Sequence, residues 1–306
     1  MSSADPHPAA LPATPQGDSP RGVALAIGTY AVWGLMPLYM HMMAAFPASE
    51  IIAHRILWSL PIAAAVLVVS GETGLVLATL RQPWMVAMAA LTATLISVNW
   101  MIYVWAVNHD RAIEAALGYY INPLFSVALG AAFLGERLSP AQRAAIAIAA
   151  AAVLILALSA GGLPPVAVGL TLSWGIYAFC KRRLPIPPNA GFTVEVLLLC
   201  PVALAYILYL GATGQGHFGE SARGTALLIG SGALTAVPLI LYANAARLIR
   251  LSTMGVLQYI SPTMVFLSAV LIFNEPYQGA QRIAFPMIWT ALLIYGATLI
   301  RRPAAR

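Results

Sequence analysis

No charged side chain occurs between Ala144 and Cys180, a segment far too long for a single membrane crossing. The hydrocarbon core of a bilayer is about 30 Å thick and takes about 20 apolar residues per helix. The break Gly161–Pro165 (GGLPP) divides this segment, so we predict two helices joined by a tight turn. Charged residues make up only 8% of the chain, against roughly 25% in a soluble domain. Lipid is the solvent in which such a chain needs no polar surface.

The same breaks at charges, Pro and Gly divide the rest of the chain into segments of similar length. We therefore predict an all-α integral membrane protein with ten transmembrane helices. The expected helices cover residues 23–41, 48–69, 84–107, 113–134, 141–159, 163–180, 192–211, 224–246, 252–273 and 283–300.

The positive charges orient these helices. If the N-terminus is cytoplasmic, Arg111, Arg223 and Arg282 fall in outer loops, Arg55 falls inside a helix, and the other 12 of the 16 Lys and Arg residues lie inside. Cytoplasmic loops of membrane proteins are enriched in Lys and Arg. We therefore expect a multi-pass protein of a bacterial inner membrane with both termini in the cytoplasm.

The two ends of the chain and its two cysteines give no sign of a functional site. Residues 1–22 are rich in Pro, Ala and Ser and lack the pattern of a signal peptide, so we expect a disordered cytoplasmic tail. We expect residues 301–306 to be a second cytoplasmic tail. Cys180 and Cys200 have no Cys-x-x-Cys spacing, so neither a disulfide framework nor a metal site is expected. No dense basic run is interleaved with aromatic residues, and nucleic acid is not an expected partner.

The two halves of the chain repeat one another. Tyr120–Pro123 (YINP) recurs as Tyr259–Pro262 (YISP), 139 positions later. Ordered matches at a constant offset indicate duplication, here of five-helix repeats at 23–159 and 163–300. Because five is odd, the second repeat would be inverted, as in many secondary transporters; the alternative is that duplication only built a stable bundle. Further pairs at offsets of 139 to 141 are Glu136 with Glu275, Gln142 with Gln281, Tyr103 with Tyr242, Trp33 with Trp174, and Pro61 with Pro201.

Four segments resemble a known family. Thr29–Gly34 (TYAVWG), Glu50–Ser59 (EIIAHRILWS), Asn99–Val107 (NWMIYVWAV) and Glu114–Leu124 (EAALGYYINPL) are similar to the RarD subfamily of EamA-type permeases, within the drug/metabolite transporter superfamily. The resemblance covers about residues 21–302. It implies a ten-helix permease of the bacterial inner membrane that moves a small-molecule substrate. The RarD name is associated with chloramphenicol sensitivity, but the resemblance does not choose a substrate.

Arg55 is the main candidate for contact with a substrate. It lies about seven residues, or about 10 Å, into the second expected helix, where a charge costs at least about 2.5–3.5 kcal/mol. Its repeat partner is Glu195, 140 positions later. The two helices start on opposite faces, so we expect a central, partly hydrated cavity that substrate or water bridges, without a direct salt bridge. The alternatives are that Arg55 reaches the outer surface and that Glu195 caps a helix N-terminus.

Aromatic and amide side chains complete the expected substrate site. Buried amides need a partner, and aromatic faces beside amides suit a partly planar organic solute. Hydrogen bonding between helices is the alternative role. The candidates are Asn99, Trp100, Tyr103, Tyr120, Asn122, Tyr242 and Tyr259.

Prolines and carboxylates also occur at repeat-related positions, and we expect the prolines to act as hinges and the carboxylates to be structural. Pro123 and Pro262 each delete a backbone hydrogen bond, so they are candidate hinges, with packing kinks as the alternative. Glu136 and Glu275 end their helices. We expect both to be structural, pairing with Arg or capping the following helix.

These features favour a secondary transporter that moves a small organic metabolite or drug-like solute by alternating access. The sequence has no Walker-type loop for direct use of ATP and no nucleophile–base or metal-ligand pattern, so neither a cofactor nor catalysis is expected. Proton or ion coupling through Glu195 stays open, as do the alternatives of a channel and a membrane-embedded enzyme.

Overall fold

The computed structural model describes residues 18–134, 138–181, 184–246, 248–249, 253–254 and 257–300. All regular elements in these ranges are helices. Six of them are long and apolar enough to cross a membrane. They are α1 (Pro20–Met42), α2 (Ala48–Ser70), α4 (Pro83–Asn108), α6 (Pro140–Ala160), α8 (Pro188–Thr213) and α9 (Ala222–Ala246).

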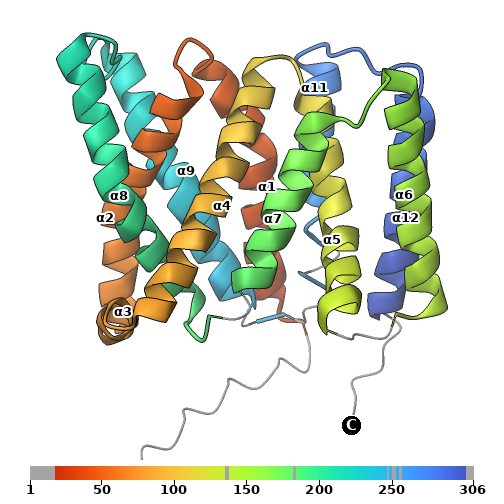
Figure 1. The fold of residues 1–306 in the computed structure, drawn as a ribbon, viewed down its shortest axis with the longest axis horizontal. Helices are drawn as coiled ribbons and strands as arrows, with labels where there is room; N and C mark the ends of the chain where they lie inside the picture. The colour runs from red at the N-terminus through yellow and green to blue at the C-terminus, as the bar shows by residue number, and fades with distance from the viewer. Residues whose placement is uncertain are drawn as a thin grey trace, which may run out of the picture.

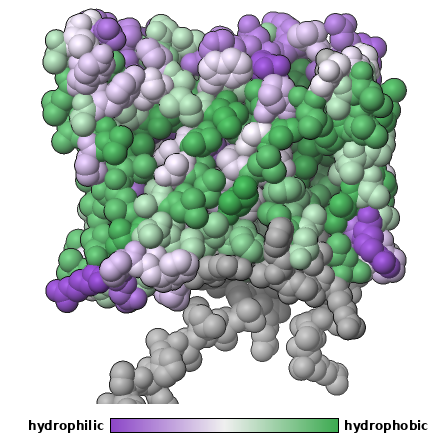
Figure 2. Space-filling view, viewed as in Figure 1, coloured by the Kyte–Doolittle hydropathy of each residue, from purple (hydrophilic) through white to green (hydrophobic). Residues whose placement is uncertain are grey.

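The other long helices stand beside these six (Figure 1). They are α5 (Ala112–Leu134), α7 (Pro165–Lys181), α11 (Ile260–Leu271) and α12 (Gln281–Ile300). We call the end that holds the α1–α2 and α4–α5 connections the upper end, and the end where α1 begins and α12 ends the lower end, as drawn in Figure 1. Figure 2 shows a mainly hydrophobic middle with hydrophilic residues gathered toward the two ends. The expected all-helical membrane fold is confirmed.

The expected helix boundaries agree with the structure to within two residues except in four places, one of which is the start of α8, at Pro188 instead of residue 192. The division of the charge-free segment lies where predicted, since α6 ends before Gly161, whose φ is +71°, and α7 begins at Pro165. Helix α1 begins at Pro20, within the expected tail. A short helix, α3 (Thr73–Leu80), lies at the lower end and was not expected. Helix α11 begins only at Ile260, after a turn at 258–259.

Carboxylates cap helices at the upper end. Glu275, in the α11–α12 connection, accepts hydrogen bonds from the backbone N–H groups of Ala112 (2.7 Å) and Ile113 (2.8 Å) at the start of α5. Burial raises the pKa of the Glu275 carboxyl, and these two hydrogen bonds oppose the rise. The expectation that Glu275 caps the following helix was therefore wrong: it caps α5, whose first N–H groups have no partner within their own helix. Glu136 lies outside the described residues.

Glycines bring helices into close contact. A Cβ atom at Gly232 on α9 would overlap the carbonyl carbon of Trp58 on α2. At Gly118 on α5 it would lie 3.0 Å from the carbonyl oxygen of Ala167 on α7. Because lipid gives no hydrophobic drive for association, membrane helices depend on such close backbone approach. The α2–α9 contact also brings Arg55 on α2 beside Thr235 on α9.

We predict that Gly232→Ala destabilises the protein by about 1–3 kcal/mol, because the added methyl group must push α9 away from α2. Gly28→Ala is the matched control, since a methyl group added to this helical glycine of α1 would meet nothing within 4 Å. The measurement is thermal unfolding in detergent, followed by reaction of a thiol dye with the buried Cys200. Equal midpoints for the two variants would contradict the packing argument.

Candidate functional site

A guanidinium group lies buried between the two halves of the chain. Arg55, on α2, is only 2% exposed. Its Nε donates a hydrogen bond to Oγ1 of Thr235 on α9, at 3.0 Å. Its Cζ lies 4.8 Å from the ring centroid of Trp100 on α4, a distance typical of cation–π contacts. Arg55 therefore does not reach the surface, which was the alternative interpretation.

Two tyrosines complete this group. Tyr103 lies one turn after Trp100 on α4, and its ring centroid is 5.5 Å from that of Tyr119 on α5. Both tyrosines lie close enough to Arg55 to interact electrostatically with its charge. We call Arg55, Trp100, Tyr103, Tyr119 and Thr235 the Arg55 cluster. It draws on α2, α4 and α5 from the first half and on α9 from the second.

The Arg55 cluster has unused hydrogen-bond donors. Nη1 of Arg55 and the hydroxyl of Tyr103 are buried and have no hydrogen-bond partner in the described part of the chain. The ion pairs found among the described residues do not include Arg55. A buried charge without an opposite charge is costly, and an anion placed beside Arg55 would neutralise that charge.

Glu195 differs, because protein groups satisfy its charge. This carboxylate on α8 is 2% exposed and lies 2.5 Å from Nζ of Lys181, at the end of α7. Oγ1 of Thr92 on α4 donates to it at 2.7 Å, and the hydroxyl of Tyr177 lies 3.5 Å away. Glu195 follows the start of α8 by seven residues and caps no helix. Its ion pair joins α7 to α8.

The remaining candidates lie in other helix contacts. The side-chain amide of Asn99 donates to the carbonyl of Leu170 (3.1 Å) and to the hydroxyl of Ser173 (2.9 Å), both on α7. The hydroxyl of Tyr120 donates to Thr263 on α11, at 2.8 Å. These two residues therefore link helices in this conformation.

Tyr242 packs against Tyr30 and Trp33 on α1, with ring centroids 6.5 and 6.1 Å away. The Oδ1 of Asn122 and the hydroxyl of Tyr259 are buried and have no hydrogen-bond partner within the described ranges. Of the nine expected substrate-binding residues, the structure thus brings Arg55, Trp100 and Tyr103 together.

The two expected hinge prolines differ in their surroundings. Pro123 lies within a continuous α5, whereas Pro262 is the third residue of α11, just after the turn at 258–259. Prolines also lie inside other helices, so position alone does not single out these two. The others are Pro37, Pro61, Pro201, Pro238 and Pro286.

A cavity of about 530 Å³ opens at the upper end, among the α1–α2 connection, the end of α4 and His217 in the α8–α9 connection. His217 is held there by the buried Glu50, through its Nδ1 at 2.7 Å and its backbone N–H at 2.8 Å. The described residues contain no group of three or more His, Cys, Asp or Glu side chains that would hold a metal ion.

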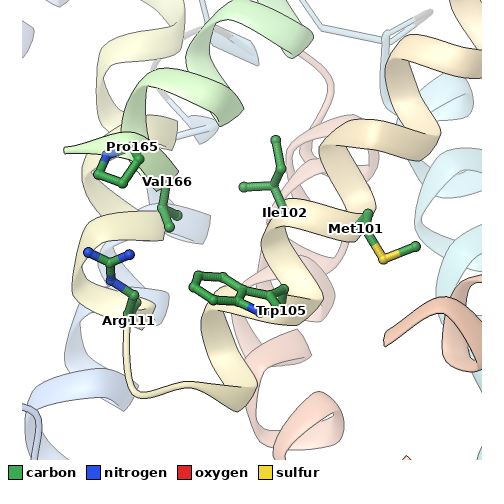
Figure 3. A pocket seen from close by; sticks show the side chains of 6 residues that line it. All are labelled: Met101, Ile102, Trp105, Arg111, Pro165 and Val166. Atoms are coloured by element: carbon green, nitrogen blue, oxygen red, sulfur yellow. The ribbon is translucent and has the colours of Figure 1, made fainter. Parts of the chain in front are cut away.

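A second pocket, of about 320 Å³, lies on the side of the molecule between α4 and α7. Figure 3 shows the ring of Trp105 between Arg111 and Met101, with Val166 above it. The guanidinium carbon of Arg111 is 5.9 Å from the ring centroid of Trp105. A half-exposed Trp beside Arg is typical of a membrane interface. The lining residues are Met101, Ile102, Trp105, Arg111, Pro165 and Val166.

We predict that Lys181→Met destabilises the protein by about 3 kcal/mol, because it leaves the carboxylate of Glu195 buried without an opposite charge. The double variant Lys181→Met with Glu195→Gln removes that charge as well and should regain most of the loss. The measurement is thermal unfolding of the single and double variants in detergent. Additive losses in the double variant would show that the ion pair does not stabilise the fold.

Comparison with known proteins gives a consistent result. Residues 20–158 match the EamA-like transporter family. The protein RarD of Salmonella typhi is 38% identical over 276 residues, which cover 90% of this chain and 94% of RarD. The uncharacterized transporter YojE of Bacillus subtilis is 39% identical over 281 residues, covering 91% of this chain and 94% of YojE. A solved crystal structure superposes with a TM-score of 0.59 at 21% identity, over 92% of this chain and 98% of the other, and so shares the fold.

Proposed function

We propose that this chain, which belongs to the RarD-type permeases of the EamA-like transporter family, moves a small organic solute across a bacterial inner membrane by alternating access. The observation that carries the proposal is the Arg55 cluster. It places a charged group with unused donors between helices of both halves. A solute bound there would contact both halves at once, so their relative movement could carry it.

The pattern of helix contacts supports ten membrane-spanning helices arranged as two related halves. The repeat makes α1, α2, α4, α5 and α6 equivalent to α7, α8, α9, α11 and α12. Helix α1 packs on α9, and the equivalent α7 packs on α4; likewise α5 packs on α7, and α11 on α1. Equivalent helices also pair with each other, as α2 does with α8 and α6 with α12. Exchange of the halves maps these named pairings onto one another, as two repeats related by a two-fold axis require.

A local hydrogen bond supports the same equivalence. The side-chain oxygen of Gln142 accepts from the backbone N–H of Ser139 at the start of α6, at 3.0 Å. The side-chain oxygen of Gln281 accepts from the backbone N–H of Gln278 at the start of α12, at 3.3 Å. Both residues of the second pair lie 139 positions after those of the first. In this proposal, α6 and α12 start at opposite faces of the membrane.

The distribution of cations supports a cytoplasmic lower end. Apart from Arg55, the described cations divide between the two ends: Arg21, Arg81, Arg143 and Lys181 lie at the lower end, and Arg111, Arg223 and Arg282 lie at the upper end. The excess of positive charge marks the cytoplasmic side. Both termini are then cytoplasmic, and the cavity beside His217 opens to the outside.

We predict counterflow by the purified protein in proteoliposomes. Vesicles preloaded with one of a panel of amino acids, aromatic acids or antibiotics should transiently accumulate the same labelled solute for at least one member. Arg55→Gln should lower this uptake at least about tenfold, since a desolvated charge contact is worth about 2 kcal/mol or more. Arg111→Gln is the matched control, because Arg111 is partly exposed and lies outside the Arg55 cluster.

Simple equilibration without transient accumulation would indicate a channel. Unchanged counterflow in Arg55→Gln would remove the Arg55 cluster from the pathway. Coupling of transport to protons or ions through Glu195 would require release of its carboxylate from Lys181.

A further inference from the structure

The charge balance of the Arg55 cluster limits what it can bind. A guanidinium keeps its positive charge in proteins. The described residues supply Arg55 with a neutral hydroxyl, from Thr235, and the face of Trp100. A ligand with one negative charge would neutralise the site, whereas a cation would add to the uncompensated charge.

The free donors limit the anionic group. Nη1 of Arg55 and the hydroxyl of Tyr103 are the buried donors of the cluster that have no partner among described residues. Two donors match the two oxygens of one carboxylate. A phosphate monoester carries about −1.5 to −2 charges at pH 7 and three acceptor oxygens, which exceed both the charge and the donors available.

The buried carboxylates of the described chain are already occupied, so an ammonium group would find no free partner. Glu195 holds Lys181, Glu50 holds His217, and Glu275 holds two backbone N–H groups. A zwitterion with an ammonium beside its carboxylate would therefore lose solvation of that ammonium without an ion pair in return. This favours a net anion over a zwitterion.

The aromatic rings favour a flat ligand. Trp100 lies against the guanidinium, and the rings of Tyr103 and Tyr119 pack on each other beside it, so a planar organic group would find aromatic faces there. Thr235 fixes the direction of the guanidinium: its hydroxyl donates to the carbonyl of Ser231 at 3.0 Å, so its oxygen lone pair is available to Nε of Arg55.

We infer that the solute is a flat, net-anionic organic carboxylate, whose carboxylate binds Nη1 of Arg55 and the hydroxyl of Tyr103. Its planar body lies against Trp100 and Tyr119. This inference rests on the proposed function, since it assigns the substrate class of the same site. Thr235 is a positioning residue, because it acts through Arg55.

The test measures binding of four probes of similar size to the purified full-length protein at pH 7: benzoate, benzamide, benzylamine and phenylalanine. Benzoate should raise the thermal midpoint saturably, because a ligand of the folded state stabilises it. The other three should leave the midpoint unchanged at the same concentrations. Chloride at equal ionic strength is the control for a bare anion, and an equal rise with chloride would overturn the assignment of an organic carboxylate.

Variants separate binding from folding. Arg55→Gln should weaken benzoate at least about tenfold, and Arg111→Gln should leave it unchanged. Tyr103→Phe removes only a buried hydroxyl that has no partner among the described residues, so the thermal midpoint of the unliganded protein should not fall. The affinity for benzoate should decrease about threefold to tenfold. Thr235→Val should weaken benzoate through loss of the Nε contact. Full benzoate affinity in both Arg55→Gln and Tyr103→Phe would overturn the inference.

The two proposals can fail separately. Counterflow of a cation or neutral solute that requires Arg55, with no effect of benzoate, would overturn the proposed substrate class but not the proposed transport function. Arg55-dependent binding of benzoate, with no counterflow of any solute, would overturn transport and leave a carboxylate site.

Discussion

Within a bilayer, no water replaces a missing hydrogen bond, and this constraint shapes every part of the molecule. Most backbone N–H and C=O groups form hydrogen bonds within helices. The first N–H groups of α5 and α7 donate instead to carboxylates from elsewhere in the chain. Glu275 serves α5, and Glu114 serves α7 through the N–H of Val166, at 2.8 Å. Since hydrophobic burial adds little between helices in lipid, small residues such as Gly232 allow the close contact that holds α2 against α9.

The same constraint distinguishes the two buried charges of Glu195 and Arg55. In the proposed repeat, Glu195 and Arg55 occupy equivalent positions, yet their surroundings differ. Glu195 has a lysine, a threonine and a tyrosine around it, and the resulting ion pair joins α7 to α8. Arg55 has one neutral hydrogen-bond partner, an aromatic face and an unused donor. A transporter needs an interior polar group whose charge and hydrogen bonds the protein itself does not fully satisfy. A solute can then bind to that group and leave again.

Sequence alone predicted the helical membrane fold, the family and the place of Arg55 within a helix, because the hydropathy of consecutive residues and the spacing of motifs carry this information. The cavity expected around Arg55 stays a prediction. It did not predict α3, which is too short and too close to its neighbours to stand out as a separate helix. It also missed Thr235 and Tyr119 beside Arg55, and Lys181 beside Glu195. These pairs depend on how helices rotate and cross. In the sequence, Lys181 resembles an ordinary loop cation next to two arginines, and only the packing of α7 on α4 and α5 directs it toward α8.

Alternating access requires that the Arg55 cluster be exposed to each side of the membrane in turn. The most direct measurement is the reactivity of a single cysteine, in Thr235→Cys with Cys180→Ser and Cys200→Ser, toward an impermeant thiol reagent applied to sealed vesicles of either orientation. We predict reaction from both sides, with benzoate protecting the cysteine on each at a concentration raised to offset the weaker binding expected from loss of the Thr235 hydroxyl. Reaction from one side only would contradict alternating access, and no reaction from either side would show a dry, purely structural centre.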